Sequence, residues 1–585
     1  MRATFRRSTP FSGLAPAIVL AAALAGLAGC GGGGSSAAPG PAPAPAPAPS
    51  PSPAPGPAPA PSPAPAPVDG KVSVGPGCVQ YSITAPAALT GVDPLIAQQW
   101  HLTNTGQSGG IAGEDLRVTD AWAVTRGAGA RIAVIDDAVE VTHPDLRPNL
   151  VEGASFSYRS TNYASVWPLP CSTASDASGP IEGHGTAVAG LAAARDGNAL
   201  GVSGVAPRAS LVAYDALASG TEVDIANALN RDAAATGVYH NSWGSPDDGA
   251  LHAADTLFLN ALSAGLANGR AGKGSVYVFS AGNGACFRRS LNVCQVDNSN
   301  YDGFVNTLGV IAVCAVDHAG TVASYSEPGA NLAVCAPSSG NGTPNVVTTS
   351  LLGSTRTDFS GTSASAPMVS GVVALMLAAN PNLTWRDVRL ILAATARRPI
   401  NSLADPSWEA SALVSRRADA QARAFSHKYG FGVADAKEAV RVASTWASVG
   451  GSSTLRSCTA SITVNQALQD ASTLGTGTTV PSTIAVTGCA VTQVEFVEVT
   501  LTSDHSYAGD LQVRLVSPGG TTSQLADRRA CGGGSTCGSY ATGHVFGSLR
   551  HLDEIANGAW RLDVTDLAPS DLGTFNSWSI KIYGR

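Results

Sequence analysis

The sequence of 585 residues carries a net charge of −7, and only 13% of its residues are charged. This length leaves room for more than one domain, each with a hydrophobic core of its own. Lysine and arginine do not form runs beyond the N-terminus, where Arg2, Arg6 and Arg7 lie close together. Because a nucleic-acid partner requires a basic surface, the composition argues against that class of function.

The N-terminus has the pattern of an export signal. The basic residues precede an apolar stretch, residues 11–29, that is rich in Ala and Leu. It ends in Leu-Ala-Gly-Cys30, which resembles the lipobox of bacterial lipoproteins, where the cysteine is lipidated and becomes the mature N-terminus. Residues 1–30 are therefore predicted to be a lipoprotein signal with Cys30 as the lipidation site, and Gly31 favours the outer membrane. The alternatives are an ordinary secretory signal and a retained anchor helix.

Residues 31–68 form a low-complexity segment. They are Gly and Ser followed by a nearly uninterrupted Pro/Ala alternation, with no apolar periodicity that builds a core. We interpret this segment as a disordered linker. Residues 69–92 then form a short segment before the first folded domain, and this is short for a folded pro-domain.

Ten of the 11 cysteines follow Cys30, and an even number in an exported chain suggests disulfides. The close pairs Cys286/Cys294 and Cys531/Cys537 are the most plausible local bridges, while the connectivity of the others stays open. No CxxC pair or Cys/His cluster has the spacing of a zinc site.

Short apolar runs alternate with helical patterns between residues 93 and 450. Continuous apolar runs suit the buried strands of a parallel sheet. They cover residues 131–135, 211–214, 276–280, 308–313 and 332–336, and helical patterns cover 185–194, 223–235, 251–267 and 368–379. The region is predicted to be a three-layer α/β domain with a mostly parallel sheet.

The texture changes after residue 450. Residues 494–501, 511–515 and 578–583 alternate apolar with polar side chains and are separated by turns that contain glycine. This pattern is typical of a β-sandwich, so residues 451–585 are predicted to form a separate all-β domain.

Three residue types of a nucleophilic site occur in informative positions. Asp136 follows the apolar run 131–135, so its carboxylate is expected at the carboxyl edge of the sheet, where α/β sites assemble. His184 opens a helical pattern, and Ser363 lies in the small-residue turn 361–367 before another. A serine is a poor nucleophile without a base and a group that orients the base. Asp136, His184 and Ser363 supply these three roles.

Asn283 follows the apolar run 276–280 and fits a side-chain donor to a developing oxyanion. Three of the four residues have a structural interpretation when taken alone: Asp136 as a helix cap, His184 as a turn residue and Asn283 as a left-handed turn former. Their occurrence together on one α/β pattern favours catalysis. The order Asp, His, Ser is the subtilisin order.

The motifs around these residues resemble the subtilisin-like serine protease family. They are Val134-Ile135-Asp136, Gly183-His184-Gly185-Thr186 and Gly361-Thr362-Ser363-Ala364-Ser365-Ala366-Pro367. Asp137 directly after Asp136, the segment 241–249 and the segment 297–303 resemble the kexin/furin branch. Residues 451–585, with motifs at 505–511 and 517–521, resemble the jelly-roll P domain of the proprotein convertases. The resemblance assigns residues 93–450 to the catalytic domain.

The resemblance also implies residues that bind substrate. Asp247 and Asp302 line the primary specificity pocket by motif match, Trp243 and Gly244 lie on the strand that binds the substrate, and Asp137 faces the next subsite. A substrate arginine is always charged and prefers carboxylate partners, which agrees with these acids. The chain departs from the family before His184, where it has Ile181, Glu182 and Gly183. A basic residue two positions before the cleaved bond is therefore a weaker expectation than arginine directly before it.

The resemblance implies Ca²⁺, a hard cation that binds oxygen ligands. One site would use Asp93, Asp145 and Asn198, and a second would use Asp247, Asp297 and Glu327. Taken alone, each acid would be a solvated loop residue; the positions match as sets. Two further departures are Ala138 after the paired aspartates and a longer loop around Cys286 and Cys294.

The sequence thus predicts an exported, lipid-anchored, monomeric serine endopeptidase of the bacterial cell envelope that acts on proteins or peptides with basic residues. It would cleave after arginine and favour dibasic sites. The alternatives are a broad-specificity degradative subtilase and an inactive surface binding protein. The P domain is interpreted as a stabilising partner of the catalytic domain.

Overall fold

The structure is a computed structural model that describes residues 89–159, 167–171, 181–285, 296–340, 342–419, 423–532 and 537–585. It also describes Cys78 and the backbone of four short strands, β1 (Lys71–Val72), β2 (Tyr81–Ser82), β7 (Arg288–Ser290) and β8 (Val293–Gln295). The described residues belong to one compact unit. The predicted signal, the linker 31–68 and the pair Cys286/Cys294 lie outside the described residues or have no described side chains.

A six-stranded parallel sheet forms the centre of the first domain. Its strand order is β10-β9-β6-β5-β3-β4. The strands are β3 (Arg131–Ile135), β4 (Ser210–Tyr214), β5 (Val238–Asn241), β6 (Val276–Ser280), β9 (Val310–Val316) and β10 (Leu332–Pro337). Nearly all of their side chains are buried, as expected for a sheet that is covered on both faces.

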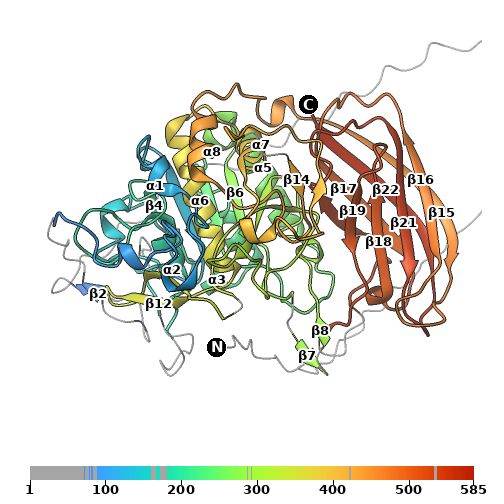
Figure 1. Ribbon diagram of the computed structural model, residues 1–585, viewed down its shortest axis with the longest axis horizontal. Coiled ribbons are helices and arrows are strands. Elements are labelled where there is room, and N and C mark those ends of the chain that lie inside the picture. The colour runs from blue at the N-terminus through green and yellow to red at the C-terminus, as the bar shows by residue number, and fades with distance from the viewer. Residues whose placement is uncertain are drawn as a thin grey trace, which may run out of the picture. The chain divides into compact units, whose positions relative to one another are not determined.

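Helices cover both faces of this sheet (Figure 1). They are α1 (Val118–Ala121), α2 (His184–Ala193), α3 (Ala216–Ser219), α4 (Glu222–Ala228), α5 (Thr256–Gly272), α6 (Thr362–Ala379), α7 (Trp385–Thr395) and α8 (Ala436–Ala443). Successive strand residues point to opposite faces. On β5, His240 contacts Ser370 of α6, whereas Tyr239 stacks on Tyr277. The Tyr277 hydroxyl lies against Gly265 of α5, so α5 and α6 lie on opposite faces.

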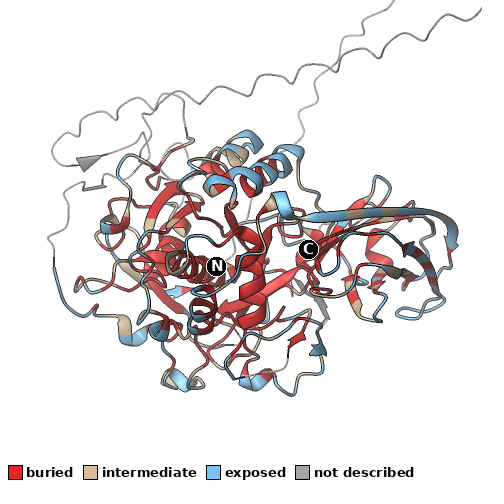
Figure 2. Ribbon diagram, turned by 90° about the horizontal axis from the view of Figure 1, so that it is seen from above, coloured by how far each residue is buried: buried red, intermediate tan, exposed pale blue. Residues whose placement is uncertain are grey.

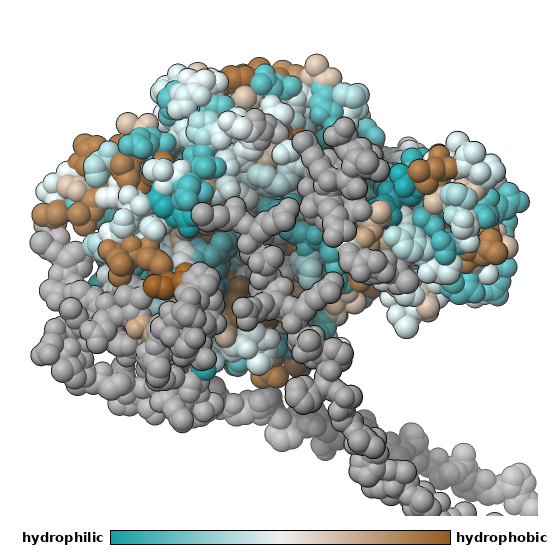
Figure 3. Space-filling view, turned by 90° about the horizontal axis from the view of Figure 1, so that it is seen from below, coloured by the Kyte–Doolittle hydropathy of each residue, from teal (hydrophilic) through white to brown (hydrophobic). Residues whose placement is uncertain are grey.

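The described residues contain one helix that is long and apolar enough to cross a membrane, α6, and 83% of its most apolar window is buried in the protein. Figure 2 shows that the central elements are buried (red) and that exposed residues lie at the periphery. On the face in Figure 3, the brown apolar groups are separated by teal and white residues. The apolar character of α6 is therefore that of a core helix.

The C-terminal region is a sandwich of two four-stranded sheets, β15-β22-β17-β20 and β16-β21-β18-β19. The strands are β15 (Arg456–Leu468), β16 (Thr479–Val486), β17 (Val494–Ser503), β18 (Leu511–Val516), β19 (Thr522–Ala526), β20 (His544–Ser548), β21 (Gly558–Asp566) and β22 (Gly573–Gly584). The alternating pattern predicted from sequence is present, for example in β16, where every second residue is buried. The first domain also contains antiparallel strand pairs: β7 with β8, β11 (Val346–Thr349) with β12 (Thr355–Phe359), and β13 (Glu409–Ala410) with β14 (Ala424–Phe425).

Four disulfides are present among the described cysteines. The predicted Cys531–Cys537 bridge is confirmed. The others join cysteines that are distant in sequence: Cys78–Cys171, Cys314–Cys335 and Cys458–Cys489.

Candidate active site

The candidate residues follow three adjacent strands of the sheet. Asp136 comes directly after β3, Ser242 directly after β5, and Asn283 three residues after β6. These strands are neighbours in the order β6-β5-β3. Because the carboxyl ends of parallel strands meet at one edge, these residues lie at the same edge of the sheet, where the sequence predicted the Asp136 carboxylate.

Asp136 and His184 form a hydrogen-bonded pair. The Nδ1 atom of His184 lies 2.8 Å and 3.1 Å from the two carboxylate oxygens of Asp136. Asp136 is 1% exposed, whereas the side chain of His184 is 35% exposed. The ring of His184 also packs against Phe359. A carboxylate at Nδ1 keeps the proton on that nitrogen, so Nε2 remains available to accept one.

Ser363 occupies the second position of α6, and its hydroxyl donates to the carbonyl of Ser242 at 3.4 Å. Pro367 explains the local backbone. Proline has no N–H, so the carbonyl of Ser363, four residues earlier, receives no hydrogen bond from the helix. The hydroxyl of Ser242 donates to that carbonyl instead, at 3.0 Å. Ser242, which is not part of α6, thus stabilises the first turn of this helix.

Asn283 is fixed against the same helix. Its Oδ1 accepts hydrogen bonds from the backbone N–H of Thr362 at 2.8 Å and from the Thr362 hydroxyl at 3.0 Å. The Nδ2 group on the other side of the carboxamide is therefore turned away from Thr362. Together with the positive end of the α6 dipole, this donor suits an oxygen that becomes negative near Ser363.

Asp302 is held rigidly in the predicted specificity pocket. Its carboxylate accepts from the backbone N–H of Ser245 at 2.8 Å, the Ser245 hydroxyl at 3.0 Å and the Phe304 N–H at 2.8 Å. A Cβ atom at Gly244 would lie 2.5 Å from Oδ2 of Asp302, so this position requires glycine. Trp243 donates its indole N–H to the carbonyl of Ile135 at 3.0 Å, and its ring packs against Phe279 and Phe304.

Asp137 accepts four backbone hydrogen bonds, from Ala138 at 2.6 Å and from Gly183, His184 and Gly185 at 2.8–3.2 Å. Three of these donors open α2, so Asp137 caps the helix that begins at His184.

Glu182, near Asp137, forms an ion pair with Arg159. Arg159 also approaches Asp215, with its Nε 3.4 Å from Oδ2. The basic side chain needed to balance the acids near Asp137 is therefore supplied within the chain, a feature that the sequence did not reveal.

The first predicted cation set is brought together. Asn198 joins both acids, because its side-chain amide donates to Asp145 at 2.8 Å and its backbone N–H donates to Asp93 at 3.1 Å. Ser203 donates to the other oxygen of Asp93 at 2.6 Å. Burial and the nearby charge of Asp93 raise the pKa of Asp145 to about 7. A bound cation would offset this effect, because it would stabilise the ionised carboxylates.

The second predicted cation set surrounds Gly284. A Cβ atom there would lie 2.7 Å from Asp297, 2.9 Å from Glu327 and 3.0 Å from Asp247. Burial and the charges of Asp297 and Asp247 hold the pKa of Glu327 well above its ordinary value. The described residues nevertheless contain no group of three or more His, Cys, Asp or Glu side chains in a metal-binding arrangement. By donor chemistry, both sets fit a hard cation that binds oxygen ligands.

Comparison with known proteins agrees with this arrangement. Residues 127–432 match the subtilase family, and residues 494–582 match the proprotein convertase P domain. Over 84% of the chain, it is 33% identical to Protease KEX1 of Kluyveromyces lactis and 31% identical to human neuroendocrine convertase 2. The matches span 60% and 74% of those proteins, respectively.

The chain belongs to the subtilase family of serine endopeptidases, in its kexin and furin branch. A crystal structure of the Aeromonas sobria serine protease, in complex with a chaperone, is similar over 85% of this chain and 96% of that one. The TM-score is 0.69 at 26% identity. The subtilisin-like fold and the C-terminal P domain are thus confirmed.

The subtilase site contains one buried residue that sequence analysis missed. His240 on β5 is 0% exposed, and its Nε2 lies 2.8 Å from the Ser242 hydroxyl. Burial lowers the pKa of His240 to about 3, so the ring stays neutral. Residues 238–241 were not predicted to be a strand. Without that strand, nothing in the sequence indicated that His240 contacts Ser242, whose hydroxyl donates to the Ser363 carbonyl.

The Asp136–His184 pair predicts how activity depends on pH. Burial alone would lower the pKa of His184, but the charge and hydrogen bond of Asp136 raise it to about 9. A His184 side chain that acts as general base would have to lose its proton before it accepts one from serine. We therefore expect kcat/KM for a peptide substrate to rise with pH, with a midpoint above the ordinary value of 6.5 and approaching about 9.

Folding stability should change in the opposite direction. Because the pKa of His184 is raised by folding, its contribution to stability is full below about 6.5 and is lost as the pH rises to about 9. Rate profiles and thermal melts over this range test both trends. An activity midpoint below 6.5 would contradict the proposed effect of Asp136.

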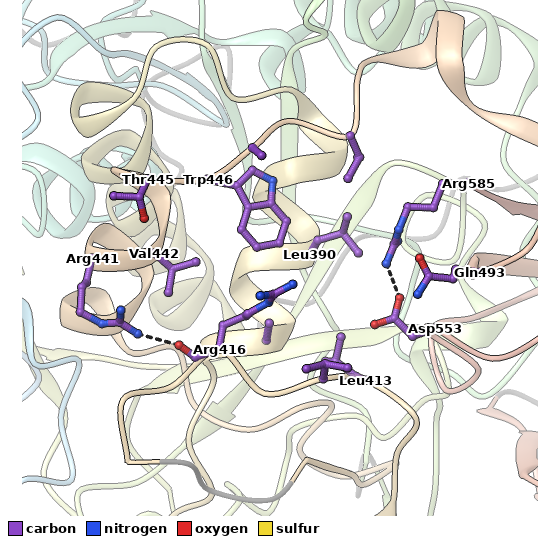
Figure 4. A pocket seen from close by; sticks show the side chains of 14 residues that line it. Leu390, Leu413, Arg416, Arg441, Val442, Thr445, Trp446, Gln493, Asp553 and Arg585 are labelled. Atoms are coloured by element: carbon purple, nitrogen blue, oxygen red, sulfur yellow. Dashed lines mark hydrogen bonds and ion pairs between the residues drawn. The ribbon is translucent and has the colours of Figure 1, made fainter.

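A cavity of about 620 Å³ lies elsewhere, between α7, α8 and residues near the C-terminus. Figure 4 shows Arg416 pointing into it beside Trp446, while Arg585 and Asp553 pair at its side. None of the triad candidates lines it, so this cavity is not where the described chemistry takes place.

Proposed function

We propose that the protein is an exported serine endopeptidase that hydrolyses peptide bonds after arginine and favours dibasic sites. The observation that carries the proposal is the Asp136–His184 hydrogen bond at the sheet edge where Ser363 opens α6. His184 would take the proton of the Ser363 hydroxyl as the oxygen attacks the substrate carbonyl. The same ring would then give the proton to the leaving amine.

Asn283 and Asp136 stabilise the charges that form in this step. The Nδ2 group of Asn283 would donate to the oxyanion of the tetrahedral intermediate. Asp136 would stabilise the imidazolium of His184 without itself taking the proton. Hydrogen bonds of this kind are often long in the free enzyme and tighten when substrate binds, which agrees with the resting contact between Ser363 and Ser242.

Substrate choice follows from the acids of the pocket. Asp302 and Asp247 would pair with the guanidinium of the arginine before the cleaved bond, with the backbone of Trp243 and Gly244 beside it. Relatives named kexin and neuroendocrine convertase support this assignment. Asp137 would favour a second basic residue more weakly, because it caps α2 and because Arg159 pairs with its neighbour Glu182.

Fluorogenic peptides test the proposal. We expect kcat/KM for peptides that end in Lys-Arg to exceed that for peptides that end in Phe or Leu by about 30-fold or more, since a buried charge pair contributes roughly 2–5 kcal/mol. Peptides that end in Ala-Arg should be cleaved only moderately less well than Lys-Arg. Equal turnover of all of them would instead support a broad-specificity degradative subtilase.

Calcium is proposed as the bound cation. Asp93, Asp145 and Asn198 would hold one ion, and Asp247, Asp297 and Glu327 another. Bound Ca²⁺ would supply the positive charge that these clustered carboxylates lack.

Chelation tests the calcium proposal. A cation at about 100 times its Kd stabilises a fold by about 2.7 kcal/mol, so a chelator should lower the Tm of a unit of this size by about 3 °C and reduce activity with it. Asp145→Asn should shrink this response, whereas the control Asp358→Asn, at an exposed acid, should keep it. An unchanged Tm, with no metal found by elemental analysis, would refute the site.

Location in the cell envelope is proposed from the signal sequence. Cys30 would carry the lipid that anchors a monomeric enzyme, and residues 31–68 would act as its tether. Labelling of cells with radioactive palmitate should depend on Cys30. Unchanged labelling of Cys30→Ser would refute the anchor.

A further inference from the structure

The segment 297–303, which carries Asp302, contacts the P domain directly. Asn300 and Gly547 of β20 exchange two hydrogen bonds: the Gly547 N–H donates to Oδ1 at 2.7 Å, and Nδ2 donates to the Gly547 carbonyl at 2.8 Å. The ring of His544, also on β20, lies 3.2 Å from the carbonyl of Asn300. One side of this segment is therefore fixed by a P-domain strand.

Tyr301, the residue before Asp302, belongs to the P-domain core. Its side chain is packed in the apolar cluster of the sandwich, and the residue is 3% exposed. Its hydroxyl accepts the backbone N–H of Asp527 at 3.0 Å. The guanidinium of Arg529 lies 3.8 Å from the centre of the ring. A side chain that is adjacent to the specificity acid is thus buried by the other domain.

A second P-domain segment, which contains Arg529 and Cys537, contacts residues 248–252. Arg529 donates from Nε to the carbonyl of Gly249. Leu251 donates its N–H to the carbonyl of Cys537 at 3.0 Å. A disulfide joins Cys537 to Cys531, which lies two residues after Arg529.

Residues 248–252 are in turn hydrogen-bonded to the segment 297–303. The N–H of His252 donates to the Tyr301 carbonyl, and the Gly303 N–H donates to the His252 carbonyl, both at 2.8 Å. The N–H of Gly249 donates to Asp297 at 2.8 Å. Gly249 therefore connects the two side chains, because its N–H donates to the Asp297 carboxylate and its carbonyl accepts from the Arg529 guanidinium.

We propose that the P domain sets substrate specificity, with Arg529 and Tyr301 as positioning residues for Asp302. The inference rests on the proposed function, because it assumes that Asp302 pairs with a substrate arginine. A guanidinium is recognised through two parallel hydrogen bonds, which require carboxylate oxygens at fixed positions. The residues before and after Asp302 are held by hydrogen bonds and packing, which fixes the positions of these oxygens. Loss of these contacts lets the carboxylate move by a fraction of an ångström, which is enough to weaken both hydrogen bonds to the guanidinium.

The test compares Arg529→Met with Arg386→Met in the full chain. Arg386 of α7 also joins the two domains, through a buried pair with Glu495 at 2.6 and 2.8 Å, but it has no contact with the segment 297–303 among the hydrogen bonds and ion pairs of the described residues. Both variants should lower the Tm. Only Arg529→Met should reduce the ratio of kcat/KM for arginine over lysine peptides, by about tenfold, through a higher KM for arginine with kcat nearly unchanged.

Tyr301→Phe is the second variant, because it keeps the buried ring and removes only the hydroxyl. It should lower the same ratio by about threefold, and it decides the matter if Arg529→Met does not fold. An unchanged ratio in the folded Arg529→Met and Tyr301→Phe variants would overturn the positioning role, as would an equal loss in Arg386→Met. If the unaltered enzyme cleaves arginine and leucine peptides equally, the proposed function itself is wrong, and the positioning role falls with it.

Discussion

Ser363→Ala should lower kcat for peptide hydrolysis by about 10⁶-fold while KM changes little. The variant lacks the oxygen that attacks the carbonyl, and in subtilisin, loss of the serine alone costs about as much as loss of the whole triad. The pocket acids and Asn283 remain, so substrate still binds. Single-turnover measurements on an arginine peptide, with active-site titration of the unaltered enzyme, provide the comparison.

Folding is the matched control for this variant. Ser363 is the second residue of α6, and alanine fits a helix well, so the Tm of Ser363→Ala should stay within about 2 °C of the unaltered protein. Ser365→Ala lies on the same turn and loses hydrogen bonds to the carbonyls of Ala336 and Pro337. It should be less stable but active. Undiminished proteolysis in Ser363→Ala would show that another residue attacks, and would favour an inactive subtilase scaffold.

Residues near one another in sequence were placed well by their pattern. The runs predicted as strands at 131–135 and 276–280 coincide with β3 and β6, because each is a continuous apolar segment that ends at a polar residue. The helix predicted from 368 begins six residues earlier, at Thr362, since small residues gave no apolar signal for its first turn.

Contacts between distant segments account for most of the differences. The helix predicted from 251 begins at Thr256 with Asp255 as its cap, because Leu251 and His252 pair with Cys537 and Tyr301 instead. The helix predicted to reach 235 ends at Ala228. Its continuation turns through Asp232, which has a φ of 55°.

The disulfides and the pocket differ from the sequence expectation for the same reason. Cys314 and Cys335 are partners on the neighbouring strands β9 and β10, so their bridge depends on strand order rather than on spacing. The sequence suggested that the P domain stabilises its partner, but the placement of Tyr301 in the P-domain core required the structure. No local pattern connects residue 301 with residue 529.

Asn283→Ala should lower kcat by about 10²–10³-fold with little change in KM. Removing one oxyanion donor costs about 2.7–4 kcal/mol in the transition state and leaves ground-state binding intact. The loss is expected to be large here because Oδ1 of Asn283 is held by two groups of Thr362, so that Nδ2 is aimed before substrate arrives. Thr362→Val is the matched control, because it removes one of these two bonds and keeps the donor. It should cost less than about tenfold. If Thr362→Val and Asn283→Ala lower kcat equally, the effect comes from the start of α6 rather than from an oxyanion donor.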